Sequence, residues 1–316
     1  MRLAFVGKGG SGKTTSTALL SLFLSNNGHN VTVIDADLNM HMSELLGLEK
    51  PSEEKRISNP KASIEIKKYL IGNNKKIRDI KEFKKTTPPS IGSNLFDPLD
   101  KNDFILQNYA SKSKNFNLIT VGTYDEESIG TSCYHVNLSI FENILSHTKD
   151  EGAFIISDMV AGTDAFANTL HSQFDALILV IEPTRKGLSV YEQYSGLAKE
   201  AGVFDNLLVI GNKIMNEDDK NFILQNIPEN KVLGFIPLSE YLRNHEKVGG
   251  KLDLSRLEEN VKNFLREFEK KLIDLEVSPS KRIKRLHELH LKYSSQESVV
   301  STLGDLSNQI DKSFKF

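Results

Sequence analysis

Residues 7–15 hold the pattern that points most directly to chemistry. They read Gly-Lys-Gly-Gly-Ser-Gly-Lys-Thr-Thr, and they stand between the apolar run Leu3–Val6 and a stretch of helix-forming residues. The fixed residues match the phosphate-binding pattern G-x-x-x-x-G-K-[ST] in the strand–loop–helix context that it requires. Glycines let such a loop wrap closely, so that backbone N–H groups converge on phosphate oxygens at the helix N-terminus. A chance glycine-rich turn would not need every fixed residue, and the pattern therefore predicts an ATP-binding site.

The residue types within this loop predict which side chains contact the phosphates and which one ligates the metal ion. Lys13 should reach the β- and γ-phosphates, and the hydroxyl of Thr14 should ligate Mg²⁺. The other positions expected to contact the nucleotide are Gly9, Gly10, Ser11, Gly12 and Thr15. ATP and Mg²⁺ are thus the expected cofactors, and hydrolysis of ATP is the expected reaction.

Aspartates close two further apolar runs. Val31–Ala36 is followed by Asp37, with Asp35 two residues before it, and Ile155–Ser157 is followed by Asp158. A carboxylate at a strand end near the phosphate loop would hold Mg²⁺ through water, and we expect this of Asp158. Acidic residues at strand ends can also serve only solubility, but three such features in the expected order favour a nucleotide site.

Short apolar runs that alternate with longer helix-like segments must position these residues. The expected strands are 2–6, 30–35, 117–121, 153–158, 175–181, 206–211 and 231–235, and the expected helices are 13–24, 136–148, 188–201 and 255–274. Most strands are continuously apolar, as Ala176–Ile181 is, which is typical of a parallel sheet covered by helices on both faces. The sequence therefore predicts an α/β fold with a doubly wound, mostly parallel sheet.

Two segments depart from this alternation. Residues 50–110 look like a helical insertion, with loop signals at Pro88-Pro89 and Gly92-Ser93. Ser278-Pro279-Ser280 marks the end of the core, and a polar helical tail follows it. We therefore expect one ATPase domain at residues 1–277, which contains the insertion, and a helical extension at residues 278–316.

Composition limits the classes of protein to consider. With 316 residues, the chain is long enough to bury a sizeable core. Its single cysteine, Cys133, rules out an intrachain disulfide and fits a reducing cytoplasm. No apolar run approaches the roughly 18–20 residues that span a bilayer, and the chain starts without a signal-peptide pattern. We expect a cytoplasmic protein with no integral membrane segment.

The formal net charge of −2 conceals an uneven distribution. Residues 50–85 hold 12 Lys/Arg against 5 Asp/Glu and residues 279–316 hold 7 against 4, so these segments carry +7 and +3 while the remainder carries −12. Such asymmetry can mark a surface for nucleic acid or another anion. A solvated, helix-rich insertion is the alternative that we favour, and the stretch offers few aromatic side chains to stack on bases.

Lys8 adds a narrower feature to the phosphate loop. With it, residues 8–14 read KGGSGKT, which resembles the deviant Walker A sequence of the MinD/ParA class of dimeric ATPases. The resemblance implies that ATP closes a homodimer and that Lys8 reaches the phosphates bound to the partner subunit. A cation delivered in this way neutralises transition-state charge only when the dimer closes. An exposed loop lysine without such a role is the alternative.

The same resemblance extends to the strand-end carboxylates and to the base. It implies that Asp37 orients the attacking water and that Asp35 belongs to the Mg²⁺ shell or to a switch. The run VIGNK resembles the family's strand that ends in Asn-Lys, which implies that its Asn212 contacts adenine. The run GFIPL resembles the loop that packs on the base, which assigns Pro237 to that contact. A plain turn after the strand is the alternative.

Within this class, most of residues 1–255 resemble the nickel-insertion ATPases that mature carbon monoxide dehydrogenase, which are related to the nitrogenase iron protein. The segments that carry the resemblance are VGKGGSGKTT (6–15), DADLNMHMSELLGL (35–48), TPP (87–89), GSNL (92–95), DMVAG (158–162), EPTR (182–185) and GNK (211–213). The resemblance implies a metalloenzyme client for the ATP-dependent homodimer, and hence a metallochaperone or maturation switch.

One motif of that family is altered here. The family has a Cys-x-Cys pair before a helix, and two subunits pool their pairs into one metal site. The matching stretch of this chain contains Cys133 and His135 instead. A two-fold dimer would supply Cys₂His₂, which suits tetrahedral Zn²⁺ better than square-planar Ni²⁺. We predict a Zn²⁺ or Ni²⁺ site at the dimer interface, with loss of the metal site as the alternative. A Cys₄ iron–sulfur cluster needs two cysteines per subunit and is excluded.

Two further departures bear on function. Val160 stands where the family usually has glutamate, which affects the switch chemistry rather than ATP binding. The tail, which includes His287 and His290, extends beyond the family's usual end, and a solvated helical face or a docking element is a better explanation for it than a metal site. Three functions remain open: a switch that acts on a metalloenzyme, an organising ATPase that binds DNA or membrane, and an ATP-gated scaffold with little turnover. The TPP, DMVAG and Cys-x-His features favour the first.

Overall fold

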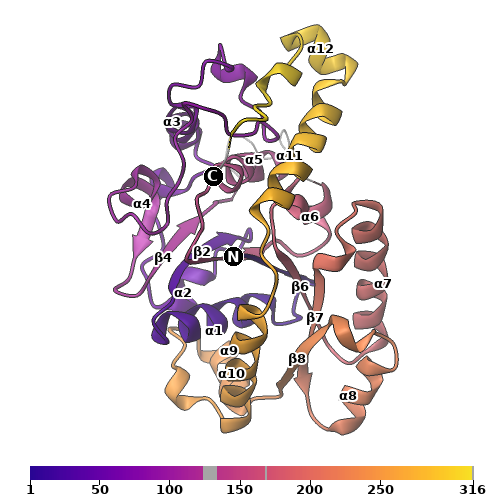
Figure 1. The fold of residues 1–316 in the computed structure, drawn as a ribbon. Coiled ribbons are helices and arrows are strands. Elements are labelled where there is room, and N and C mark those ends of the chain that lie inside the picture. Colours follow the sequence, from indigo (N-terminus) through magenta and orange to yellow (C-terminus); the bar gives the residue numbers. More distant parts are fainter. Residues whose placement is uncertain (124–133, 168, 315–316) are drawn as a thin grey trace.

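The described residues form an α/β fold around one sheet of eight strands (Figure 1). The computed structural model describes residues 1–123, 134–167 and 169–314. The sheet has the order β3-β4-β2-β5-β1-β6-β7-β8, and neighbours pair in parallel except β3, which is antiparallel to β4. The strands are β1 (Arg2–Gly7), β2 (Asn30–Ala36), β3 (Ala110–Lys112), β4 (Phe116–Thr120), β5 (Ala153–Met159), β6 (Ala176–Ile181), β7 (Leu207–Ile214) and β8 (Val232–Pro237). This confirms the predicted fold class.

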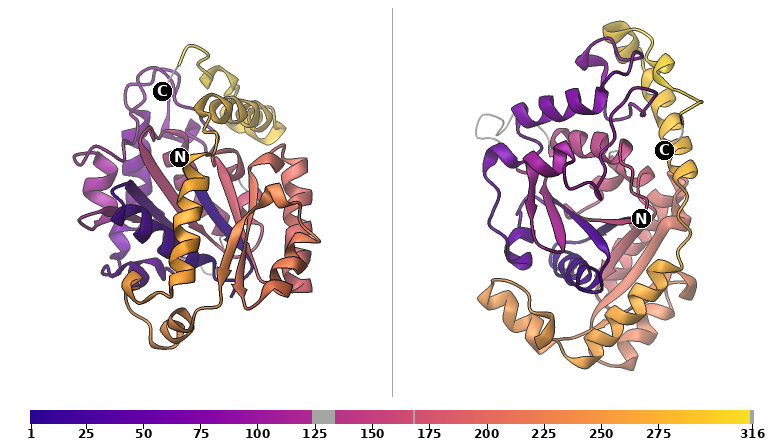
Figure 2. Two further views of the ribbon diagram at one scale, coloured as in Figure 1. Left: turned by 60° about the horizontal axis from the view of Figure 1, so that its bottom comes forward. Right: turned by 60° about the vertical axis from the view of Figure 1, so that its left-hand side comes forward.

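Helices cover both faces of the sheet (Figures 1 and 2). They are α1 (Lys13–Asn26), α2 (Met42–Leu46), α3 (Pro60–Ile71), α4 (Phe104–Tyr109), α5 (Tyr134–Ser146), α6 (Asp164–Ala167), α7 (Arg185–Glu200), α8 (Glu217–Leu224), α9 (Glu240–Val248), α10 (Glu259–Ile273), α11 (Pro279–Ser294) and α12 (Glu297–Leu303). Among these described helices, none is long and apolar enough to cross a membrane.

The strands are apolar throughout because both of their faces are buried. Along β1, Ala4 and Val6 join a core formed with α3, α4, α5 and α7, whereas Leu3 and Phe5 join a core formed with α1 and α10. Side chains that alternate along a strand point to opposite faces of the sheet, so each face needs its own set of apolar residues. The central strands thus place their carboxyl ends between two helical layers.

Local signals explain where the elements differ from the expected ranges. Helix α7 begins three residues earlier than predicted, because the side chain of Thr184 caps it by accepting a hydrogen bond from the N–H of Gly187 at 3.1 Å. The range 255–274 is broken by a 3₁₀ turn, Leu254–Arg256, before α10 begins. The sequence does not predict strand β3, because none of its three residues has a β-branched or aromatic side chain.

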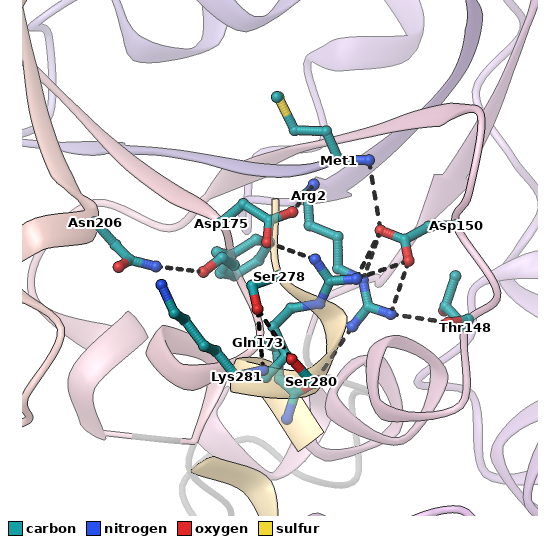
Figure 3. Close-up of polar contacts among 12 residues, drawn as sticks. Met1, Arg2, Thr148, Asp150, Gln173, Asp175, Asn206, Ser278, Ser280 and Lys281 are labelled. Atoms are coloured by element: carbon teal, nitrogen blue, oxygen red, sulfur yellow. Dashed lines mark hydrogen bonds and ion pairs between the residues drawn. The ribbon is translucent and has the colours of Figure 1, made fainter. Parts of the chain in front are cut away.

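The extension expected after residue 277 packs against the core through a buried charge cluster. Arg282 of α11 is 3% exposed, and its guanidinium pairs with Asp150 at 2.9 Å and with Asp175. Arg2, at the start of β1, also pairs with Asp150, at 3.1 Å (Figure 3). Burial acts to raise the pKa of Asp150, but Arg2 and Arg282 outweigh it and hold that pKa below its usual range. The boundary after residue 277 itself stays a prediction.

The end of the extension contacts the insertion. His290 is buried, with Nδ1 at 3.0 Å from Oγ1 of Thr86 and Nε2 at 2.9 Å from the carbonyl oxygen of Leu306. The hydroxyl of Thr87 donates to Oε1 of Gln309 at 3.0 Å. His290 through Nδ1 and Gln309 thus hold the extension against Thr86 and Thr87 of the segment 50–110, while Nε2 of His290 joins α11 to a later part of the extension itself.

Replacing Arg282 with methionine should lower the free energy of unfolding by about 3 kcal/mol, because it removes the cation from a buried pair and leaves the carboxylates. Urea denaturation followed by circular dichroism measures the change. Lys284→Met, on the exposed side of the same helix, is the matched control and should change stability by less than about 0.5 kcal/mol. Equal small effects of both substitutions would contradict a buried anchor at Arg282.

Candidate nucleotide site

The phosphate loop joins β1 to α1 and depends on glycine at two positions. Gly7 has φ 148°, and a Cβ atom there would lie 2.7 Å from the carbonyl oxygen of Val180. Gly12 has φ 90°, and a Cβ atom there would lie 2.1 Å from Nδ2 of Asn212. Only glycine accepts such positive φ values without strain, and only glycine leaves room for these neighbours. The two residues explain how the loop turns tightly between the sheet and the helix.

Lys13 is the first residue of α1, and it is only 5% exposed. Its Nζ lies 2.9 Å from Oδ2 of Asp37 and 3.2 Å from Oδ1 of Asp158. Burial acts to lower the pKa of Lys13, but Asp158 and Asp37 outweigh it and raise that pKa. Lys13 is therefore a fixed cation at the carboxyl ends of β2 and β5, where phosphates would compete with two carboxylates for it.

Thr14 and Asp158 lie together, as a Mg²⁺ site requires. The hydroxyl of Thr14 lies close enough to the carboxylate of Asp158 to act to lower the pKa of that group. Asp158 is fully buried, and its Oδ2 atom has no hydrogen-bond partner among the described residues. Burial raises the pKa of Asp158 to about 6, although Lys13 acts to lower it. A buried carboxylate oxygen without a partner, beside a hydroxyl, fits a hard cation that prefers oxygen ligands.

Asp37 and Asp35 hold the loop after β2 in different ways. The carboxylate of Asp37 accepts hydrogen bonds from Lys13 and from the N–H of Asn39, the latter at 3.0 Å. Burial acts to raise the pKa of Asp37, but Lys13 and Asn39 outweigh it and lower that pKa. Asp35 accepts the N–H groups of Asp37 and Met42, each at 3.2 Å, and burial raises its pKa to about 8. These contacts show how Asp35 holds the loop, and both of its expected roles, in the Mg²⁺ shell or in a switch, stay predictions.

One cavity of ≈ 290 Å³ brings most of the expected phosphate residues together, whereas Ser11 lines the neighbouring cavity on the side of α7. It is lined by Lys8, Gly9, Gly10, Gly12, Lys13, Thr14, Thr15, Asp37, Asn39, His41, Ala161 and Glu246. The sequence analysis assigns no role to Asn39, His41 or Glu246, although the first two lie in the segment 35–48 that carries the family resemblance. The first two closely follow Asp37 in the chain, which is a usable signal, but Glu246 comes from α9 at the far end of the core.

A second cavity, of ≈ 210 Å³, adjoins the first at the carboxyl ends of β7 and β8. Asn212 and Pro237, the two residues expected at the base, both line it, together with apolar side chains such as Leu19 and Leu242. Asn212 also donates from Nδ2 to the carbonyl oxygen of Ser11 at 2.7 Å, which ties the end of β7 to the phosphate loop. The apolar lining suits a nucleotide base, and its position beside the phosphate cavity suits one ligand that fills both.

Lys8 is exposed, unlike Lys13, and lies between two hollows. It lines the phosphate cavity and also a cavity of ≈ 620 Å³ on the side of α7, with Arg185 and Lys186. In the described residues, Lys8 forms no ion pair, so its ammonium group is available to a second molecule. Lys13 of the same loop instead pairs with Asp37 and Asp158.

The predicted metal pair cannot be placed in this geometry. Cys133 lies outside the described residues, and of His135 only the backbone, in the first turn of α5, is described. In the described residues, no group of three or more His, Cys, Asp and Glu side chains could hold a metal ion. A metal site at Cys133 and His135 stays a prediction.

Sequence comparisons agree with this geometry. The model of the CobQ/CobB/MinD/ParA nucleotide binding domain family matches residues 3–278. An uncharacterized ATP-binding protein of Methanocaldococcus jannaschii is 30% identical over 260 residues, which covers 80% of this chain and 91% of that protein. The carbon monoxide dehydrogenase accessory protein CooC of Rhodospirillum rubrum is 28% identical over 251 residues, which covers 79% of this chain and 88% of CooC.

Solved structures show the same fold. The cell division ATPase MinD of Pyrococcus furiosus superposes with a TM-score of 0.54 at 21% identity and covers 86% of this chain and 98% of its own. The ATP complex of a variant of McdA from Cyanothece superposes with a TM-score of 0.57 at 16% identity and covers 88% of this chain and 97% of its own. The phosphate loop, the carboxylates around Lys13 and the family match lead to one conclusion. The chain is a P-loop ATPase that belongs to the CobQ/CobB/MinD/ParA nucleotide-binding domain family.

Proposed function

We propose that ATP closes this protein into a homodimer and that hydrolysis opens it again. The observation that supports this most directly is the contrast between two lysines of one loop. Lys13 is buried against two carboxylates, whereas Lys8 is exposed and lines cavities on both sides of the loop. An exposed cation at the edge of a phosphate cavity is suited to stabilise charge on a nucleotide bound by a second subunit.

Four side chains around the phosphate cavity would have separate roles in hydrolysis. Mg²⁺, held by Thr14 and through water by Asp158, would neutralise the β- and γ-phosphate oxygens. Lys13 binds the same phosphates, which requires it to exchange its carboxylate partners for phosphate oxygens. Asp37 lines the phosphate cavity, and the N–H of Asn39 acts to lower its pKa independently of Lys13, so it would stay ionised at neutral pH and orient the attacking water.

Light scattering of the full-length protein tests this proposal. We expect the mass of a dimer with Mg-ATP and of a monomer with Mg-ADP or with no nucleotide. A mass that is the same under all three conditions contradicts an ATP-driven cycle. Binding of the ATP form to DNA or to lipid vesicles, without any dependence on metal, would favour the organising alternative.

The relationship to CooC supports a narrower proposal, that the client of the dimer is a metalloenzyme. The name of CooC links that protein to carbon monoxide dehydrogenase. For this chain, Cys133 and His135 would carry the metal. One subunit offers two ligands, whereas a closed tetrahedral site needs four, so the metal should bind only to the dimer. ATP and Zn²⁺ then raise each other's affinity by the same factor.

Zinc should therefore bind at one ion per dimer and tighten by about 10-fold or more with a non-hydrolysable ATP analogue, a coupling within the usual range for linked sites. Equilibrium dialysis with Zn²⁺ measures this for the wild type, Cys133→Ser and His135→Ala. Both variants should lose the ion, and binding should weaken as the pH falls through the range in which the ligands take up protons. His29→Ala, distant in the chain and paired with Glu269, should bind as the wild type does. Zinc that survives in either site variant contradicts the assignment.

A further inference from the structure

The phosphate and base cavities share part of their lining. Gly12, Thr15 and Glu246 border both of them. Gly12 and Thr15 belong to the phosphate loop and the first turn of α1, where they face the phosphates. Glu246 belongs to α9, so a second helix also lines the junction of the two cavities. In a nucleotide that places phosphates in one cavity and its base in the other, the ribose lies at this junction.

Helix α9 is held firmly at its amino end. The side chain of Ser239 accepts the N–H of Leu242 at 3.0 Å and donates to Oε2 of Glu258 at 2.6 Å. Oε1 of the same glutamate accepts the N–H of Tyr241 at 3.1 Å. Leu242 and Arg243 line the base cavity, and Glu246 follows on the same face, since residues three and four apart share one side of a helix. The helix therefore presents Glu246 from a fixed position.

The carboxyl end of α9 is tied to the loop that carries Asp37. The N–H of Gly250 donates to Oε1 of Glu44 at 2.7 Å, and the N–H of Leu252 donates to the carbonyl oxygen of Leu45 at 2.9 Å. Gly249, beside this carboxylate, has φ 75°, a left-handed conformation that favours glycine. Since α2 directly follows residues 37–41, the position of Glu246 is set relative to the phosphate cavity as well as to the base.

The carboxylate of Glu246 is not used within the chain. In the part of the chain that the structure describes, it forms no hydrogen bond and no ion pair, and the residue is exposed. A free carboxylate repels polyphosphate, so it is unfavourable at this site unless its partner is a neutral donor. Ribose offers two adjacent hydroxyl groups, and a carboxylate can accept both in charge-assisted hydrogen bonds.

We propose that Glu246 binds the ribose hydroxyls of ATP and thereby selects ribonucleotides over deoxyribonucleotides. The inference rests on the proposed placement of ATP across the two cavities. It adds a specificity residue that belongs to neither the phosphate loop nor the strand ends. It also explains why an acidic side chain borders a site built to bind a polyanion.

The test compares ATP, 2′-deoxy-ATP and 3′-deoxy-ATP by titration calorimetry, which needs no label on the ribose. Hydrogen bonds to a charged group support a preference of about 10-fold or more. The wild type should bind ATP more tightly than either deoxynucleotide by that factor. Glu246→Ala should bind all three alike, at the affinity of the wild type for the deoxynucleotides, and Glu246→Gln should keep part of the preference. Glu240→Ala, an exposed glutamate on the same helix that lines neither cavity, should keep all of it.

The outcomes separate this inference from the proposed function. Equal affinity of the wild type for the three nucleotides overturns the role of Glu246 while leaving ATP binding intact. A preference that persists in Glu246→Ala, or a uniform loss of affinity for all three, overturns it as well. Failure of the wild type to bind any of them would instead count against the assignment of the site to ATP.

Discussion

Lys13→Ala should lose tight ATP binding, with an affinity at least about 100-fold weaker than that of the wild type. The reason is that the substitution removes the cation that faces the phosphates, and charge-assisted hydrogen bonds to phosphate are among the strongest single contacts in such a site. In the structure, Nζ of Lys13 already lies at the wall of the phosphate cavity, within 3.2 Å of two carboxylates. Titration calorimetry with Mg-ATP measures the loss, and phosphate release should fall to background.

The control for this result must separate binding from folding. Removing Lys13 leaves Asp37 and Asp158 without their shared cation, and an unpaired buried carboxylate is destabilising. Urea denaturation of the variant shows whether it remains folded at the temperature of the titration, and Lys13→Gln, which keeps a polar donor, provides a second variant. Lys270→Ala, exposed on α10, should bind ATP as the wild type does. A folded Lys13 variant with wild-type affinity would contradict the assignment.

The phosphate loop could be predicted from sequence because its determinants are local. Gly12 and Lys13 act through backbone conformation and a single side chain, so their spacing alone indicates the site. The two strand-end carboxylates were also predictable, since the carboxyl ends of parallel strands meet at one edge of a sheet. That reasoning predicts that Asp37 and Asp158 lie near each other, but it does not predict that both pair with Lys13.

Other parts of the site depend on contacts between distant segments, and these have no local signal. Glu246 reaches the nucleotide cavities only because α9 is anchored by Glu258 and Glu44, one on each side of it in the sequence. The basic insertion and the basic tail are likewise predictable as separate helical segments, but the contact between Thr86 and His290 that joins them is not. Pairing of this kind is decided by packing and by buried hydrogen bonds rather than by periodicity.

If the dimer cycle is correct, substitutions of Lys8 and Asp37 should have opposite effects on the ATP-bound dimer. Lys8→Ala should bind Mg-ATP within about 3-fold of the wild type, because its side chain is exposed and the buried Lys13 remains. It should not form the ATP dimer, and its turnover should fall by about 100-fold or more, as expected when a cation that acts on the transition state is lost. Light scattering with Mg-ATP, beside a phosphate-release assay, measures both. Lys186→Ala, which changes another exposed lysine of the same α7-side cavity, should keep the dimer.

Asp37→Ala should instead trap the dimer. Without Asp37, Lys13 retains Asp158 as its only carboxylate partner among the described residues, so phosphate competes with one carboxylate rather than two, and ATP affinity should stay the same or rise. The water is no longer oriented, so turnover should fall by about 100-fold or more. Since hydrolysis opens the dimer, its lifetime with Mg-ATP should lengthen by a similar factor, which light scattering after dilution into ADP can follow. Indistinguishable masses and rates for Lys8→Ala and Asp37→Ala would mean that the two residues act at the same step, and the cycle of closure before hydrolysis would then be wrong.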